Sequence, residues 1–183
     1  MQKTVILLVL MAFAAAFGGP ARAQKGAKEP PTLGFPTNLK GKPGDMVVVP
    51  LNLRTSDGLE AADIAISYDT TRLEVLKPAD VTRGTLTADF DLFLANVQDK
   101  EGTIRAGMGR SKGPIKGRGA GSLLKISFHI KANAPAGPAI INLQKKIAPT
   151  VTGLNDGNIP LVPPPEDKAG DPCDGVITVV GGK

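Results

Sequence analysis

The residue types that most often carry out catalysis or bind metal ions are scarce in this chain. His129 is the only histidine and Cys173 the only cysteine, so a zinc site of the usual histidine and cysteine type lacks ligands. A Ser-His-Asp triad would have to use His129, which lies within an alternating segment and is more simply a strand residue. Neither phosphate-loop spacing, G-x-x-x-x-G-K-[ST] or G-x-G-x-x-G, occurs. We therefore expect a protein that is not an enzyme and has no cofactor of its own.

Two polar segments carry oxygen atoms of the kind that bind calcium. Glu166–Asp174 is an acidic loop, and Asn155–Asn158 is a polar turn. Neither segment has the ligand spacing of an EF-hand loop. Paired carboxylates of the glycosidase type depend on the fold rather than on spacing, so the sequence does not identify such a pair. We interpret both segments as exposed loops and predict no metal site.

A basic segment from Arg105 to Arg118 contains five basic residues and no acidic residue. Such a segment can accelerate association with an acidic partner, or it can bind nucleic acid or a sulfated glycan. The simplest interpretation is a solvated loop. The whole chain has a net charge of +5, and an amino-terminal segment with two basic residues and no acid accounts for part of it. The remaining charge is small, so we do not expect a nucleic-acid partner.

The amino-terminal segment has the pattern of an export signal. A charged start precedes Val5–Phe17, an apolar run of about 13 residues that is shorter than the roughly 20 residues of a membrane span. The tripeptide Ala21-Arg22-Ala23 then fits the cleavage pattern of small residues. We predict that residues 1–23 are a signal peptide, that cleavage near Ala23 leaves a secreted or periplasmic protein without a membrane span, and that residues 24–31 are a flexible leader.

Alternating apolar and polar residues dominate the rest of the chain and predict β-strands joined by turns rich in glycine and proline. In the clearest case Ile64, Ile66 and Tyr68 share one face. The predicted strands are residues 46–53, 62–68, 73–75, 90–94, 103–108, 123–130, 139–143 and 176–180. Such short strands pack as two sheets of a jelly-roll or Ig-like sandwich, in one domain over residues 32–180. With a single cysteine an internal disulfide is excluded, so apolar burial and backbone pairing must stabilise it.

Five segments, in order, resemble the cohesin domain, the receptor module of cellulosome scaffolds. They are Gly41–Leu53 (similar to GxxGDxVxVPV), Gly58–Val75 (apolar alternation, then YD and LEV), Asp99–Arg105, Gly119–Ile130 and Asp174–Val179. The resemblance spans about residues 32–180 and implies an all-β jelly-roll sandwich of about nine strands. It also implies a function, the binding of a dockerin, a small helical module on secreted polysaccharide-degrading enzymes. Calcium is then expected in that partner and not in this chain.

The resemblance further implies that the dockerin lies across the outer face of one sheet. Asp63 matches an aspartate that contacts the partner in type I cohesins, whereas Ala61 replaces an asparagine that is common in the family. Other outward positions, inferred from alternation, are Ala65, Ser67, Arg105, Gly107, Leu123, Lys125 and Ser127. Small residues around one exposed leucine would make a flat surface for a helix. For each position the alternative is an ordinary solvent-exposed residue.

A carbohydrate-binding module with the same sandwich fold is the main alternative, with direct binding of polysaccharide. Sugar-binding faces usually expose tryptophan or tyrosine, but the chain has no tryptophan and its one tyrosine, Tyr68, falls on the apolar face. A secreted hydrolase is a third, weaker alternative. We expect a monomer, since a sandwich with one binding face holds one partner.

Overall fold

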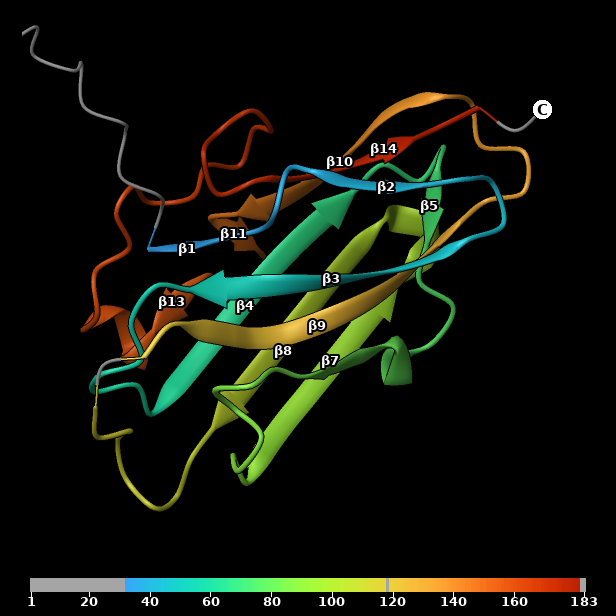
Figure 1. Cartoon of the computed structure of the whole chain (residues 1–183). Helices are drawn as coiled ribbons and strands as arrows, with labels where there is room; N and C mark the ends of the chain where they lie inside the picture. The colour runs from blue at the N-terminus through green and yellow to red at the C-terminus, as the bar shows by residue number, and fades with distance from the viewer. Residues whose placement is uncertain (1–31, 118, 182–183) are drawn as a thin grey trace, which may run out of the picture.

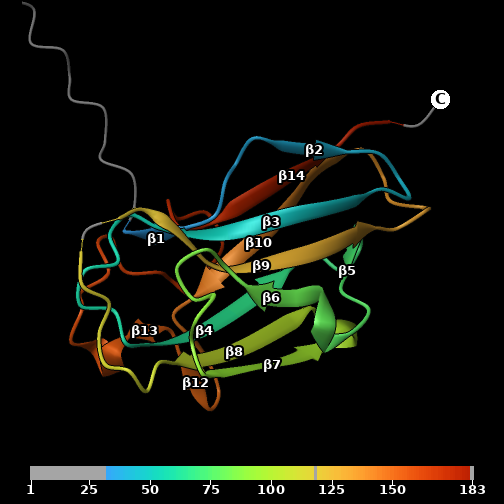
Figure 2. The same ribbon diagram turned by 60° about the horizontal axis from the view of Figure 1, so that its bottom comes forward.

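The computed structural model describes residues 32–117 and 119–181. The predicted signal peptide, residues 1–23, and the predicted leader, residues 24–31, lie outside the described residues. Two sheets pack face to face in a β-sandwich (Figures 1 and 2). The prediction of an all-β jelly-roll sandwich is confirmed.

One sheet is built on β3 and β9 and has the order β1–β3–β9–β5, with β6 also paired to β9. We call it the β3–β9 sheet. Its strands are β1 (Leu33–Gly34), β3 (Met46–Leu53), β5 (Leu73–Glu74), β6 (Val81–Arg83) and β9 (Gly121–Ile130). The long strands β3 and β9 match predicted segments, whereas β1 and β6 were not predicted.

The second sheet has the order β2–β14–β10–β4–β8–β7, and β13 also pairs with β4. We call it the β4–β8 sheet. Its strands are β2 (Leu39–Gly41), β4 (Ala61–Tyr68), β7 (Leu92–Gln98), β8 (Thr103–Gly109), β10 (Gly137–Gln144), β13 (Gly153–Leu154) and β14 (Gly175–Val179). Only β14 and β2 pair in parallel among the described strands.

Short elements complete the fold. A separate hairpin joins β11 (Lys146–Ile147) to β12 (Thr150–Val151) between β10 and β13. Three single turns of 3₁₀-helix are η1 (Pro78–Asp80), η2 (Asp99–Glu101) and η3 (Asn155–Gly157). In the described part of the chain no helix is long and apolar enough to cross a membrane.

The core lies between the two sheets, where the predicted alternation places it. Ile64, Ile66 and Ile126 are all fully buried. The Tyr68 ring meets the Phe128 ring edge to face, with centroids 5.2 Å apart. The Tyr68 hydroxyl is also satisfied, because it donates to the Asp99 carboxylate over 2.9 Å.

A change of register in β9 alters which side chains face the core. Leu51 pairs with Leu124, but Asn52 pairs with Ser122, so Leu123 is an extra residue in β9. Such a bulge interrupts the strict alternation of side chains. Leu123 is therefore fully buried together with Leu124, and the expectation that Leu123 points to solvent is wrong.

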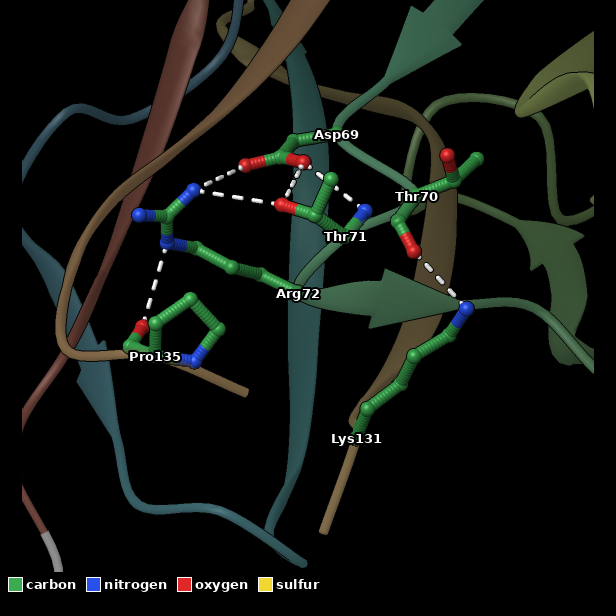
Figure 3. Close-up of polar contacts among 6 residues, drawn as sticks. All are labelled: Asp69, Thr70, Thr71, Arg72, Lys131 and Pro135. Atoms are coloured by element: carbon green, nitrogen blue, oxygen red, sulfur yellow. Dashed lines mark hydrogen bonds and ion pairs between the residues drawn. The ribbon is translucent and has the colours of Figure 1, made fainter. Parts of the chain in front are cut away.

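A cluster of polar contacts fixes the end of β4 (Figure 3). The Asp69 carboxylate accepts hydrogen bonds from the backbone N–H and the hydroxyl of Thr71 and forms an ion pair of 2.7 Å with Arg72. Arg72 also donates to the Pro135 carbonyl, in the connection between β9 and β10. Partial burial raises the pKa of Asp69, but these hydrogen bonds and Arg72 outweigh it and hold the pKa below its usual value.

We expect Asp69→Asn to lower the free energy of unfolding by about 1.5 kcal/mol at neutral pH, because it weakens charge-assisted hydrogen bonds. Since the folded state lowers this pKa, the carboxylate contributes fully above its unfolded value of 3.8. The contribution is lost as the pH falls from there through the folded pKa. Urea unfolding of both proteins at pH 7 and at acid pH measures this. An unchanged difference between the two proteins at both pH values would contradict it.

Candidate functional site

The outer face of the β4–β8 sheet has a floor of small residues beside a row of leucines. In the pairing register Leu94 lies beside Gly107, and Gly107 lies beside Asp63. One step along, Leu92 lies beside Gly109. Leu92 is 50% exposed and Leu94 64% exposed. Because both glycines lack side chains, the leucines stand above a low strip of backbone along β8.

Asp63 is the acidic residue at the centre of this face. Its side chain is exposed and has no hydrogen bond or ion pair to any residue that the structure describes. A Cβ on Gly107 would lie 3.2 Å from Asp63 Oδ1, so the carboxylate rests over the glycine. Partial burial, and then the nearby carboxylate of Asp156, raise the pKa of Asp63. The carboxylate is therefore accessible and not neutralised by a neighbour.

The β11–β12 hairpin forms a raised border on the same face, on the side of the sheet away from β3 and β9 (Figure 2). The Arg105 guanidinium holds it by donating to the Ala148 carbonyl over 2.8 Å. At its base the Thr152 hydroxyl accepts from the Ala65 N–H and donates to the Gln144 carbonyl. A hollow of about 500 Å³ opens between the hairpin, Asp63 and η3. The face is thus a trough between the leucines of β7 and the hairpin.

The structure brings only part of the predicted set onto this face. Asp63 and Gly107 lie at its centre and Arg105 at its border. Ser67 lies further along β4, half-buried, and accepts a hydrogen bond from Gln144. Ala65 was expected to point outward and is fully buried, because Thr152 and the hairpin pack over it.

The three predicted positions in β9 lie elsewhere. Lys125 pairs with Pro50 and Ser127 with Val48, so both are on the outer face of the β3–β9 sheet, across the sandwich from Asp63. Leu123 is buried in the bulge of β9. The expectation of one surface shared by β4, β8 and β9 is wrong, because alternation gives the facing of a strand but not the sheet to which it belongs.

The exposed leucines were missed as surface residues. In the predicted strand of residues 90–94, alternation puts Phe90, Leu92 and Leu94 on one face, and their apolar character assigned that face to the core. Phe90 is buried, but it precedes β7. Within the strand, Phe93, Ala95 and Val97 are the residues that pack against the core. The sequence did carry a signal for exposed apolar residues. Strand β7 has apolar residues at both odd-numbered and even-numbered positions, as expected of a strand that makes contacts on both of its faces.

The groups singled out for other chemistry have structural partners. The His129 imidazole faces the Asp80 carboxylate at 3.9 Å on the outer side of β9. Cys173 is buried, and burial, followed by Asp171, raises the pKa of its thiol to about 12. Asp174 accepts the backbone N–H groups of Leu143 and Gly170. Within residues 32–117 and 119–181 no three His, Cys, Asp or Glu residues are grouped to hold a metal ion.

The basic segment that begins at Arg105 is partly neutralised in its described part. Arg110 forms an ion pair of 3.2 Å with Asp89, and Ser111 donates to Asp91. The five aromatic side chains of the described residues do not form an exposed platform: Tyr68, Phe35, Phe90 and Phe128 are buried, and Phe93 is half-buried beneath Arg83. A sugar-stacking surface of the usual aromatic kind is therefore not found in the described part of the chain.

Comparisons with known proteins agree with this architecture. A family model of the cohesin domain matches residues 34–159. A Clostridium thermocellum OlpA cohesin, solved in a type I complex with a dockerin, is 18% identical over 82% of this chain and 99% of its own, with a TM-score of 0.61. A non-cellulosomal cohesin from Archaeoglobus fulgidus is 22% identical over 82% of this chain and 91% of its own, with a TM-score of 0.57.

A third structure, the sixth cohesin of scaffoldin B from Acetivibrio cellulolyticus in complex with a dockerin, is 23% identical. The match covers 82% of this chain and 99% of the Acetivibrio cellulolyticus chain, with a TM-score of 0.58. At these identities the likeness shows a shared fold. No curated protein matches the sequence.

Proposed function

The chain belongs to the cohesin family, and from this premise we propose that it binds a dockerin through the outer face of the β4–β8 sheet. Two of the structures to which it is similar are cohesins solved with a dockerin bound. The observation that carries the proposal is the unpaired Asp63 carboxylate, which lies between exposed leucines and a bordering hairpin on a rigid sheet. Association then needs little reorganisation of this chain.

The composition of the face supports a helical partner. Neighbouring strands are about 4.8 Å apart, so the distance from β7 to β4 is about 10 Å, close to the diameter of one helix. The leucines offer apolar area, and the carboxylate accepts hydrogen bonds from hydroxyl or amide donors. These features also favour a binding module over a catalyst.

The finer parts of the proposal come from the sequence. The signal-like residues 1–23 support export, which would bring the protein together with secreted enzymes. Calcium would belong to the dockerin and would be needed for its fold. This chain would need none, since its own sandwich is stabilised by a shared apolar core.

The proposal is tested with purified mature chain and a panel of recombinant dockerins by calorimetry. We expect saturable binding of at least one dockerin in calcium, and loss of binding when a chelator removes calcium. Circular dichroism of this chain with the chelator should not change, so that the loss is assigned to the partner. A folded chain that binds no dockerin of the panel but is retained on cellulose or chitin would contradict the proposal and favour the carbohydrate-binding alternative.

A further inference from the structure

Strand β7 ends the β4–β8 sheet, and only one of its two sides is paired. It pairs with β8 in a regular register along its whole length, and no described strand lies on its other side. The strand LFLANVQ has seven residues and contains no proline and no charged residue. A long, regular and uncharged edge strand is a template for a further strand.

The other open edges of the two sheets are protected. Strands β1, β2, β5 and β6 have only two or three residues, and β3 carries Pro50, which has no N–H to offer. Short strands and prolines are the usual means by which proteins protect sheet edges. Among the described residues β7 is therefore the exception.

The backbone groups that face the open side of β7 follow from the pairing of β8. The Tyr68 N–H donates to the Gly102 carbonyl, and the backbone N–H of Arg110 donates to the Glu60 carbonyl. The residues of β8 that bond to β4 are therefore the even-numbered ones, and the odd-numbered ones bond to β7. In the register of β7 these meet Leu92, Leu94, Asn96 and Gln98.

The intervening residues Phe93, Ala95 and Val97 must then direct their N–H and C=O groups away from β8. No described residue forms a backbone hydrogen bond with these groups. The open edge thus presents three donors and three acceptors in a row, centred on Ala95.

We infer that the occupant of this edge is β7 of a second copy of the chain, in antiparallel pairing about a twofold axis at Ala95. In this register Ala95 lies opposite itself, and Phe93 lies opposite Val97 of the second copy. Every open donor then meets an acceptor on both strands. Because β7 carries no charge, the pairing brings no like charges together. The sequence-based expectation of a monomer is the alternative that the experiment below tests against this dimer.

The strand pairing has a consequence for the proposed binding face, although the inference of a dimer does not depend on that face. A twofold axis normal to the sheet keeps the outer faces of both copies on the same side. The two Asp63 residues and the two pairs of leucines would then lie on one continuous surface. The dimer would present two equivalent binding faces side by side.

The test measures the mass of the purified mature chain by sedimentation from micromolar to millimolar concentration, without any dockerin. We expect a shift from monomer to dimer as concentration rises. Leu94 lies opposite Asn96 of the second copy, so Leu94→Lys combined with Asn96→Lys places like charges across the pairing. We expect this double variant to weaken dimerisation roughly tenfold.

A matched control, Leu94→Glu combined with Asn96→Lys, changes the same positions but places opposite charges across the pairing. This control should dimerise more tightly than the double-lysine variant. Urea unfolding should show that both variants are folded. A wild-type chain that stays monomeric over the whole range, or equal weakening by both double variants, would overturn the inference.

Hydrogen exchange distinguishes a second copy from another occupant. The amides of Phe93, Ala95 and Val97 should exchange rapidly in dilute protein and slowly in concentrated protein. Their alternate neighbours, which bond to β8, should be protected at both concentrations. Protection of the three amides that does not depend on concentration would assign the edge to a different strand and overturn the dimer.

Discussion

Replacing Asp63 with arginine is expected to lower the affinity for a dockerin roughly a hundredfold while the fold remains intact. The change removes an acceptor at the centre of the face and puts in its place a side chain that can only donate. It also adds bulk above Gly107, where only the carboxylate now lies. Calorimetry with a dockerin that binds the wild-type chain measures the effect.

The matched control is Ser127→Arg, which introduces the same side chain on the outer face of the opposite sheet. Its affinity should equal that of the wild-type chain. Both variants should keep the wild-type urea midpoint, because Asp63 has no bonding partner among the described residues and Ser127 is only half-buried. Wild-type affinity in Asp63→Arg would remove this residue from the interface, and a loss in Ser127→Arg would move the interface to the β3–β9 sheet.

The variant Gly84→Ala is expected to lower the free energy of unfolding by about 3 kcal/mol. A Cβ at this position would lie 2.1 Å from the carbonyl oxygen of Ser122 and 2.4 Å from its carbonyl carbon. Both are backbone atoms of β9 and cannot rotate away. The methyl group would also strain the hydrogen bond from the Gly84 N–H to the Leu123 carbonyl.

Urea unfolding measures this loss, and Gly119→Ala is its matched control. The nearest atom to a Cβ at Gly119 is Ser56 Oγ at 3.9 Å, an ordinary contact distance. We expect a change within about 0.5 kcal/mol for this variant. Equal effects of the two substitutions would show that the close approach of Gly84 to β9 does not limit stability.

Local alternation was sufficient to find the long strands. The segment Met46–Leu53 is a strand with the predicted bounds, and residues 62–68 differ from β4 by a single residue. Each of these segments has one clear apolar face, so a shift of register would expose the whole core side. The short strands β1 and β6 have too few residues to show a period, and their pairing depends on partners far along the chain.

The candidate binding face was less predictable than the fold for three physical reasons. The bulge at Leu123 changes the facing of one residue through a register shift that only the partner strand reveals. The burial of Ala65 depends on a hairpin more than 80 residues later in the chain. The hydrogen bond that the Ala65 N–H donates to the Thr152 hydroxyl has a sequence separation of 87. The assignment of β9 to the opposite sheet is a matter of topology, and the alternation of side chains along a strand does not indicate which sheet the strand joins. Asp63 lies on the surface where alternation predicted it.

The β11–β12 hairpin leaves the sheet after Gln144 and returns to it at Gly153, and both of these residues pair with β4. The backbone pairing of β4 is thus made by residues on either side of the hairpin, and the tip can change in length or composition without altering that pairing. On the proposed binding face, substitutions at this tip would change the contacts offered to a partner and leave the pairing of the sheet in place. Selectivity and stability can thus diverge independently in descendants of this protein.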